Sequence, residues 1–375
     1  MAWIGRVYTD LIETHLSDLR QMVFLMGPRQ VGKTALAKHI GKGRSSWKYL
    51  NWDNVRDRKV LLAGIEAVCA DLVSRAGDEK PLLVLDEIHK HSKWKGLLKG
   101  LFDLYGDEVS VVVTGSARLD VFQHGGDSLM GRYFPYRLHP FSVAELAWPK
   151  EGVDGLWRQP KKISETSWNK LLDYGGFPEP FVIGNKRFHR QWRRQRAKRL
   201  LTEDLRDLTG IRELGQVEVL AELLRHRVGQ MMSYTSYANE LNCSIETARR
   251  WLETLERLYY CYSIRPWWKN VTRALRKEPK YFLWDWSGVD DEGARFENFV
   301  ASALMKAVHC WTDIGEGDFG LHFIRDKQKN EVDFLVSRDG KPWILIEVKS
   351  SEKKSLSKSL LRFQEQLGVR HVFQV

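Results

Sequence analysis

The stretch "VFLMGPRQVGKTALAKHI", residues 23–40, constrains the fold of this chain more than any other part of the sequence. An apolar run is followed by a glycine-bounded turn and then by a helix-like pattern that fits G-x-x-x-x-G-K-[ST]. Glycines at this spacing let backbone N–H groups curl around phosphate oxygens, and the following helix N-terminus adds partial positive charge. The stretch therefore predicts a strand, a phosphate-binding loop and a helix. The residues predicted to contact the phosphates are Gly27, Pro28, Arg29, Gln30, Val31, Gly32, Lys33 and Thr34.

Four side chains in and after this loop provide the chemistry that a nucleoside triphosphate needs. Lys33 can reach the β- and γ-phosphates, and the Thr34 hydroxyl can ligate Mg²⁺. The segment "PLLVLDEIHK" (81–90) is a strand-like run that ends in Asp86 and Glu87. We expect Asp86 to hold Mg²⁺ through water and Glu87 to orient or deprotonate the attacking water. ATP and Mg²⁺ are the predicted cofactors.

A further apolar run, "VSVVVTGSARLD" (109–120), is predicted to be another strand of the same sheet. Its Thr114 and Ser116 either sense the γ-phosphate or cap the next helix, and the sequence leaves both readings open. Residues 47–53 and 133–141 are also strand-like. Strands that alternate with helical stretches predict an α/β fold with a parallel sheet and right-handed crossovers.

Several segments together resemble one prokaryotic family of AAA-type P-loop ATPases. They are "GPRQVGKT", "LDEIHK", "TGSARLDVF", "GRYFPYRLHPFSVAEL" and, later, "GGFPEPF". Members of that family join an AAA-like ATPase to a C-terminal domain of long-unassigned function. The resemblance implies that Arg132 lies near the nucleotide, as an arginine finger for its own chain or for a neighbouring subunit. A structural ion pair is the alternative role.

The composition favours a polyanionic partner and a reducing compartment. The 59 Lys and Arg residues exceed the 48 Asp and Glu residues, for a net charge of +11, which suits nucleic acid or a phosphate-rich ligand. The four cysteines show no metal-ligand spacing and are expected to be reduced, mostly buried thiols. No apolar run approaches the ~18 residues of a membrane span, and the first residues lack a signal-peptide pattern. We therefore predict a cytoplasmic protein with no membrane segment.

Residues 185–208 form a strongly basic segment that is predicted to be a long helix. Its Lys, Arg and His residues lie on all sides of that helix, not on one stripe. They either contact a phosphate backbone or form a solvated connector between domains.

The segment 231–267 has the layout of a winged helix-turn-helix. "SYTSYANEL" predicts a short helix, "NCS" a tight turn and "IETARRWLETLERLYY" a second helix with Ser244 as its N-cap. "YYCYSIRPW" then reads as a strand or wing. In a DNA-binding role Glu246, Arg249 and Arg250 would face a groove, whereas in many ATPases such a module serves only for packing.

The last hundred or so residues are predicted to fold in the order α-β-β-β-α-β, with an Asp-Gly turn at 339–340. This order resembles the PD-(D/E)XK restriction-endonuclease-like fold. Side chains repeat every two residues along a strand, so Glu347 and Lys349 should lie on one face. Asp333 and Glu347, with Glu297 from the first helix, could hold Mg²⁺, while Lys349 would place or activate water. A surface Glu–Lys pair is the alternative.

These patterns predict three domains: an AAA-like ATPase (1–150), a helical linker with a winged helix-turn-helix (151–270) and a nuclease-like α/β domain (271–375). The leading hypothesis is an ATP-hydrolysing protein that acts on DNA and has a metal-dependent nuclease fold. Its rival is a regulatory or assembly ATPase whose nuclease-like domain is catalytically silent and binds DNA or a partner. Assembly into a homo-oligomer through the ATPase domain is left open.

Overall fold

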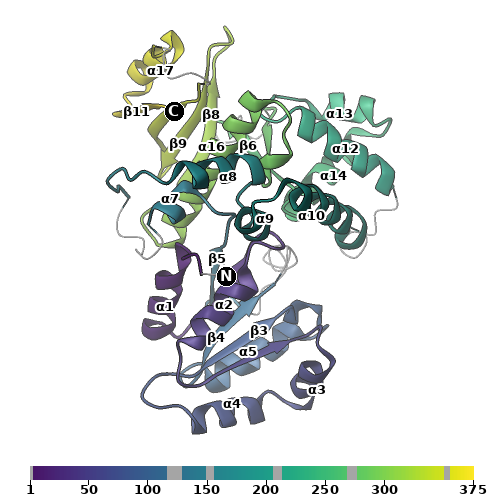
Figure 1. Ribbon diagram of the computed structural model, residues 1–375, viewed down its shortest axis with the longest axis vertical. Helices are drawn as coiled ribbons and strands as arrows, with labels where there is room; N and C mark the ends of the chain where they lie inside the picture. Colours follow the sequence, from purple (N-terminus) through teal and green to yellow (C-terminus); the bar gives the residue numbers. More distant parts are fainter. Residues whose placement is uncertain (1–2, 116–128, 149–155, 206–212, 268–276, 350–354) are drawn as a thin grey trace. The chain divides into compact units, whose positions relative to one another are not determined.

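A computed structural model describes residues 3–115, 129–148, 156–205, 213–267, 277–349 and 355–375. The chain divides into two compact units, residues 1–163 and 164–375, called here unit 1 and unit 2 (Figure 1). Among the described residues no helix is long and apolar enough to cross a membrane. Cys69, Cys261 and Cys310 are buried and Cys243 is partly buried, as the sequence predicts.

Unit 1 is built on a parallel sheet. Within the described residues its strands are β1 (Met22–Met26), β2 (Trp47–Asn51), β3 (Leu82–Asp86), β4 (Ser110–Thr114) and β5 (Tyr133–Arg137). They lie in the order β2-β3-β4-β1-β5, and every pairing is parallel. Strands β1, β3 and β4 are buried along their whole length, which explains their continuous apolar sequences. The predicted parallel α/β sheet is confirmed.

Helices surround this sheet in Figure 1. They are α1 (Tyr8–Asp18), α2 (Lys33–Lys42), α3 (Val55–Ala63), α4 (Glu66–Ser74) and α5 (Trp94–Tyr105), with a short 3₁₀ turn η1 (Ile88–Lys90). After β5 the chain continues into the short helix α7 (Val143–Ala147). One apolar core joins side chains of β1, β3 and β4 to α4 and α5, including Phe24, Leu85, Val113 and Leu98. The sheet is therefore held rigid, and the loops at its carboxyl edge can carry function.

Unit 2 begins with helices. They are α8 (Glu165–Tyr174), α9 (Pro178–Ile183), α10 (Lys186–Lys198), the π-helical η3 (Arg199–Asp204), α12 (Leu214–His226), α13 (Tyr234–Glu240) and α14 (Ile245–Arg257). The Ser244 side chain accepts a hydrogen bond from the Thr247 N–H and caps α14 as predicted. Helices α13 and α14 therefore lie where the sequence placed the helix-turn-helix pair.

A second sheet completes unit 2. Among the described residues its strands are β6 (Cys261–Pro266), β7 (Lys280–Leu283), β8 (Phe319–Arg325), β9 (Glu331–Arg338), β10 (Lys341–Glu347) and β11 (His371–Gln374), in the order β11-β10-β9-β8-β6-β7. The 3₁₀ turn η4 (Trp286–Gly288) and the helices α16 (Glu292–Asp313) and α17 (Lys358–Leu367) connect them. The predicted α-β-β-β-α-β order is confirmed. So is the turn, because Asp339 and Gly340 both have positive φ, as a two-residue hairpin requires.

The predicted boundary at residue 270 falls inside unit 2. Strand β6, from the predicted middle domain, pairs in parallel with β8 and antiparallel with β7, both of which lie beyond that boundary. Shared strand pairing joins the helical segment and the nuclease-like segment in one compact unit. The division into three functional domains stays a prediction.

Candidate functional site

The phosphate-binding loop of unit 1 connects the last residue of β1 to the first residue of α2. Gly27, Gln30 and Gly32 all have positive φ, so the backbone bends sharply in this loop. A Cβ added to Gly27 would lie 2.2 Å from the Leu138 carbonyl oxygen, so no other residue fits there without a backbone shift. The motif therefore forms the strand–loop–helix unit that the sequence predicts.

Lys33 lies against this loop and is only 9% exposed. Its Nζ donates hydrogen bonds to the carbonyl oxygens of Gly27 (2.8 Å) and Pro28 (2.6 Å). Carbonyl oxygens orient an ammonium without neutralising its charge. Lys33 is thus positioned at the loop that would wrap the phosphates.

Asp86, at the carboxyl end of β3, accepts hydrogen bonds from hydroxyl groups on three other elements. Thr34 Oγ1 (2.9 Å) and the Tyr49 hydroxyl (2.7 Å) donate to Oδ2, and Thr114 Oγ1 donates to Oδ1. Burial raises the pKa of the Tyr49 phenol, which keeps it protonated as a donor. All three donors are neutral, so these hydrogen bonds orient the buried carboxylate without adding positive charge to it. Hydroxyl and carboxylate oxygens are the ligands Mg²⁺ prefers, so Thr34 and Asp86 fit the predicted cation.

Glu87 follows Asp86 in the left-handed backbone conformation, with φ of 56°. A residue other than glycine is strained in this backbone conformation, and such strain is typical of functional positions. Burial raises the pKa of its carboxyl, and Lys90, Lys33 and Arg29 oppose that effect. A partly buried carboxylate with a raised pKa suits a general base.

Thr114 is fully buried and bonded to Asp86, so it belongs to this cluster. Whether it also senses the γ-phosphate stays a prediction. Ser116 lies outside the described residues.

The position of Arg132 differs from the expectation that it lies near the nucleotide of its own chain. It directly precedes β5, and its carbonyl accepts a hydrogen bond from the N–H of Met22, the first residue of β1. The phosphate-binding loop follows the other end of β1, roughly 13–16 Å away along a five-residue strand. The Arg132 guanidinium instead contacts both carboxylate oxygens of Asp103, at 2.9 and 3.3 Å. The structure therefore gives no support to a role in its own chain's nucleotide site.

Two residues that contact the predicted nucleotide site, Tyr49 and Arg6, belong to none of the sequence motifs. Tyr49 reaches Asp86 because β2 is the neighbour of β3, and only the sheet order reveals this. Arg6 donates to the Val31 carbonyl of the loop (2.8 Å) and pairs with the buried Glu145 (3.1 Å). It thereby ties the loop to α7, a contact between residues 139 positions apart.

The predicted acidic site of unit 2 lies at the ends of β9 and β10. The pairing of Phe334 with Ile346, continued by one residue, sets Asp333 opposite Glu347. Asp333 Oδ2 accepts a hydrogen bond from the Val348 N–H (2.7 Å), and Lys349 Nζ lies 2.7 Å from Glu347 Oε1. The expected convergence of Glu347 and Lys349 is confirmed. Glu347 Oε2 is buried without a hydrogen-bond partner among the described residues.

Glu297, on α16, has different partners from those predicted. Lys280, on β7, lies 3.6 Å from Glu297 and 2.6 Å from Glu331, and Arg325 also pairs with Glu331. Burial raises the pKa of Glu297 to about 7. The sequence did not point to Lys280 and Glu331, because only the order of the strands in the folded sheet brings them close to Glu297.

The three predicted acidic ligands do not form a metal-binding cluster. Within the described residues, no group of three or more His, Cys, Asp or Glu side chains could hold a metal ion. Two of the acids instead have cationic partners: Lys280 pairs with Glu297, and Lys349 with Glu347. Burial raises the pKa of the third, Asp333, an effect that Glu347 and Glu331 reinforce.

The predicted DNA-contacting residues Arg249 and Arg250 are exposed on α14. Arg249 lies 3.7 Å from Glu253 and stacks over the Tyr234 ring at 5.2 Å. Both guanidinium groups are accessible to a ligand.

Comparison with known families assigns unit 1 to a class. Residues 19–147 match the family model described as an AAA domain. Unit 1 therefore carries an AAA-type P-loop ATPase domain, a nucleotide-binding fold. Residues 165–288 and 292–375 match two models described as domains of unknown function, DUF8612 and DUF4143.

Two uncharacterized proteins are similar to most of this chain at low identity. The uncharacterized protein Rv2008c of Mycobacterium tuberculosis is 24% identical over 360 residues, covering 90% of this chain and 72% of the relative. The uncharacterized protein MJ1637 of Methanocaldococcus jannaschii is 22% identical over 401 residues, covering 94% and 81%.

Solved structures give weaker similarities. The Aeropyrum pernix Orc1 protein in complex with DNA has a TM-score of 0.35 and 15% identity, over 81% of this chain and 94% of that one. AMPPCP-bound DnaA from Aquifex aeolicus has a TM-score of 0.36 and 16% identity, over 68% and 89%. At these scores the assignment of unit 1 rests on the domain model and on its own loop geometry.

Proposed function

We propose that this protein is an Mg²⁺-dependent ATPase that uses ATP binding and hydrolysis in unit 1 to switch the action of unit 2 on DNA. The observation that carries the proposal is the Asp86 network, in which Thr34, Tyr49 and Thr114 orient one buried carboxylate without neutralising it. Beside it lies Glu87, whose pKa is raised by burial.

Each residue of this region has a defined task in the proposal. The loop from Gly27 to Thr34 wraps the phosphates, and Lys33 moves from loop carbonyls to phosphate oxygens. Mg²⁺, held by Thr34 and by Asp86 through water, would neutralise phosphate charge. Glu87 orients the attacking water and accepts its proton.

The acidic site of unit 2 favours a silent role over a catalytic one. The ion pairs of Lys349 with Glu347 and of Lys280 with Glu297 already compensate the carboxylates that would have to bind a cation. Unit 2 then serves to hold DNA, with the winged-helix-like face around Arg249 and Arg250 as the predicted contact. An excess of positive charge over the whole chain supports such a partner.

A metal-dependent phosphodiesterase is the second candidate for unit 2. The buried, unpartnered Glu347 Oε2 and the adjoining Asp333 favour it, because a divalent cation would satisfy both oxygens. In that role Asp333 and Glu347 hold the cation, while Lys349 stabilises charge on the phosphate. A bound cation would supply Lewis-acid chemistry to a phosphodiester.

The switch is tested by ATP turnover of the full chain with and without duplex or single-stranded DNA. We expect DNA to change turnover severalfold and the Lys33→Ala variant to show no turnover in either condition. Turnover by the parent that ignores DNA would contradict the coupling, and cleavage of plasmid with Mn²⁺ would favour the second candidate.

A further inference from the structure

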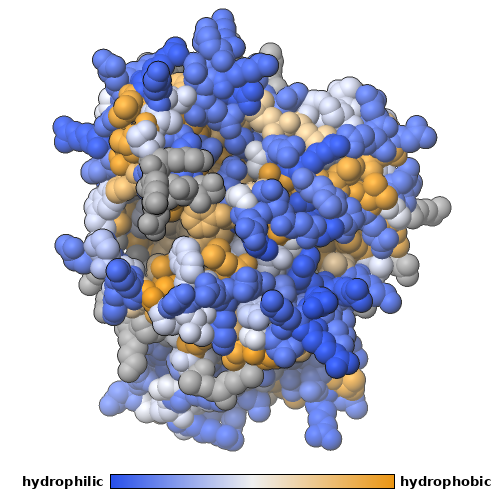
Figure 2. All heavy atoms as spheres, turned by 45° about the horizontal axis from the view of Figure 1, so that its top comes forward, coloured by the Kyte–Doolittle hydropathy of each residue, from blue (hydrophilic) through white to orange (hydrophobic). Residues whose placement is uncertain are grey.

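Arginines gather in a cleft of unit 2 whose lining includes none of the acidic residues at the ends of β9 and β10. The cleft has a volume of about 430 Å³ and lies between α10, α12 and the segment around η4. Its lining includes Arg190, Arg193, Arg194 and Arg196 from α10 and Arg225 from α12, with only Glu222 and Asp285 as described acids. Cationic side chains therefore dominate this cleft. Figure 2 shows hydrophilic residues over most of its view, interrupted by smaller apolar patches.

Helix α10 presents two distinct faces, although its basic residues are spread around the sequence of the helix. His189, Trp192 and Arg196 are buried, at the three- and four-residue spacing of one face. Arg196 stacks over the Phe177 ring at 4.2 Å and is part of the packing. Arg190 and Arg194 lie on a different face and are exposed.

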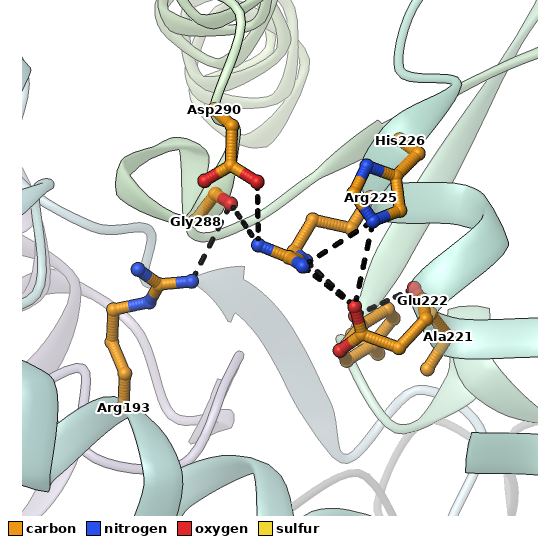
Figure 3. A network of polar contacts seen from close by, with 8 residues as sticks. Arg193, Ala221, Glu222, Arg225, His226, Gly288 and Asp290 are labelled. Atoms are coloured by element: carbon orange, nitrogen blue, oxygen red, sulfur yellow. Dashed lines mark hydrogen bonds and ion pairs between the residues drawn. The ribbon is translucent and has the colours of Figure 1, made fainter. Parts of the chain in front are cut away.

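The partners of these arginines separate structural groups from available ones. Figure 3 shows Arg225 held by two carboxylates, Glu222 at 2.7 Å and Asp290 at 3.0 Å. Arg225 also donates to the Gly288 carbonyl (3.3 Å), which accepts a second hydrogen bond from Arg193 at 3.4 Å (Figure 3). Arg225 therefore joins α12 to the η4 segment, and its charge is already compensated.

Arg193 is oriented without being neutralised, since its contact with Gly288 is to a carbonyl oxygen. Arg190 and Arg194 form no hydrogen bond or ion pair with the described residues. Arg190, Arg193 and Arg194 thus line the cleft with three guanidinium groups that no described carboxylate neutralises. The two acids of the lining have other partners: Glu222 pairs with Arg225, and Asp285 accepts a hydrogen bond from the Ser287 hydroxyl.

We propose that this arginine cleft binds the phosphodiester backbone of DNA. Guanidinium forks match phosphate oxygens in bidentate geometry and remain charged at any physiological pH. Arg190 and Arg194 lie about 6 Å apart along the α10 axis, within reach of neighbouring phosphates, which recur on each strand every ~3.4 Å of duplex axis. Backbone contacts of this kind position DNA without reading its sequence.

This inference rests on the proposed action on DNA and assigns it a contact on α10 in addition to Arg249 and Arg250 on α14. The two surfaces make different predictions, because α14 would enter a groove, whereas the cleft would bind only the backbone. Binding at the cleft is therefore expected to be insensitive to sequence and strongly dependent on salt.

The test compares the DNA affinity of Arg190→Gln/Arg194→Gln with that of the parent by fluorescence anisotropy at several salt concentrations. Both side chains are exposed and without partners among the described residues, so the variant should fold normally, which circular dichroism checks. We expect affinity to fall roughly 10–100-fold at low salt. The slope of log K against log salt should fall by about 2, one for each lost phosphate contact.

Arg56→Gln/Lys59→Gln on α3 is the matched control, because it removes two exposed positive charges that do not line the cleft. It should leave affinity within about twofold of the parent, as expected for solvent-screened charges outside the contact. Arg249→Glu/Arg250→Glu tests the α14 surface separately. If the parent binds no DNA, the proposed action on DNA is itself wrong. If the parent binds and the α10 variant behaves like the control, only the cleft proposal is overturned.

Discussion

Each unit of this protein places two carboxylates close together at strand ends. In unit 1 they are Asp86 and Glu87, at the end of β3, and in unit 2 they are Asp333, near the start of β9, and Glu347, at the end of β10. The two pairs differ in what holds them. In unit 1, the hydrogen bonds that Asp86 accepts from the described side chains come from hydroxyls, and Glu87 lies 3.5 Å from the ammonium of Lys90. In unit 2, Glu347 contacts the ammonium of Lys349, and Glu297 contacts that of Lys280. Neutral donors orient an acid and keep its charge for a cation, whereas lysines compensate that charge inside the protein.

The comparison teaches that a list of acids at strand ends is not enough to define a metal site. Both sites satisfy the same sequence expectation, yet the buried Asp86 is oriented by hydroxyl donors, whereas the buried Glu347 is held by the Lys349 ammonium. Buried ion pairs such as Lys349–Glu347 can persist without contributing much stability, so their presence in unit 2 is itself compatible with a lost or altered activity.

The largest expected effects test the nucleotide site of unit 1. Lys33→Ala should abolish ATP binding, because it removes the cation that faces the phosphates. Glu87→Gln should bind ATP as the parent does and lose hydrolysis on the order of 10²–10⁴-fold, the usual contribution of a general base. Calorimetry with ATP and a phosphate-release assay measure the two effects.

Lys42→Ala, at the exposed end of the same helix, is the control and should behave as the parent. If Lys33→Ala bound ATP as tightly as the parent, the nucleotide site assigned to unit 1 would be wrong, and its comparison with unit 2 would no longer hold.

The next effect tests whether Arg132 supplies positive charge to a nucleotide bound in unit 1. Arg132 lies at the opposite edge of the sheet and contacts Asp103, so it either forms a structural ion pair or serves the nucleotide of a neighbouring copy. We expect Arg132→Ala to leave turnover of the dilute chain within about threefold, and to lower turnover of the concentrated chain on the order of 10³-fold, as lost arginine fingers do.

Mixing Arg132→Ala with Lys33→Ala sharpens this test, because each variant carries what the other lacks. Restored turnover in the mixture would show a shared site. An equal loss at every concentration would instead mean that Arg132 acts within its own chain.

A smaller effect is expected at the second acidic pair. If lysines have replaced a cation there, the nucleotide-free parent should bind Mn²⁺ no tighter than about millimolar, a binding free energy near 4 kcal/mol. Titration calorimetry on the parent and on Asp333→Ala/Glu347→Ala decides this, with Glu292→Ala/Glu365→Ala as a control of equal charge. The contradicting result is tight Mn²⁺ binding by the parent and the control that is lost in Asp333→Ala/Glu347→Ala. The acidic site of unit 2 would then bind a cation, as the site of unit 1 is proposed to do.

The sequence predicted what depends on local spacing. The loop from Gly27 to Thr34, the Asp86 strand end and the Asp339–Gly340 turn each follow from a few consecutive residues, and all three have the expected conformation. The partners Tyr49 and Lys280 could not be predicted, because they reach the acids only through the order of the strands.

Arg132 is a different case, because the signal was available. In a parallel sheet, residues that follow strands share one edge, and residues that precede strands share the other. Arg132 precedes a predicted strand, whereas the phosphate-binding loop and Asp86 follow or end theirs. Strand direction alone therefore places Arg132 away from its own chain's nucleotide.

The smallest effect is a pH dependence that belongs to unit 2. Burial raises the pKa of Glu297 to about 7 from an ordinary value of 4.5, so the folded state holds this proton more tightly than the unfolded state. Its stabilising contribution is then fully present below pH 4.5 and is lost as the pH rises through 7, on the order of 2–3 kcal/mol in all. Urea unfolding of the full chain between pH 4.5 and 8 should show this loss in the transition of unit 2.

Glu297→Gln should flatten that dependence, while Glu292→Gln, at a 91% exposed position on the same helix, should not. Saturating Mn²⁺ distinguishes the two accounts of the site. A cation bound by Asp333 and Glu347, the ligands of the second candidate, would keep both carboxylates ionised, so that stability would rise with pH. A profile unchanged by Mn²⁺ is the result expected of carboxylates that lysines already hold.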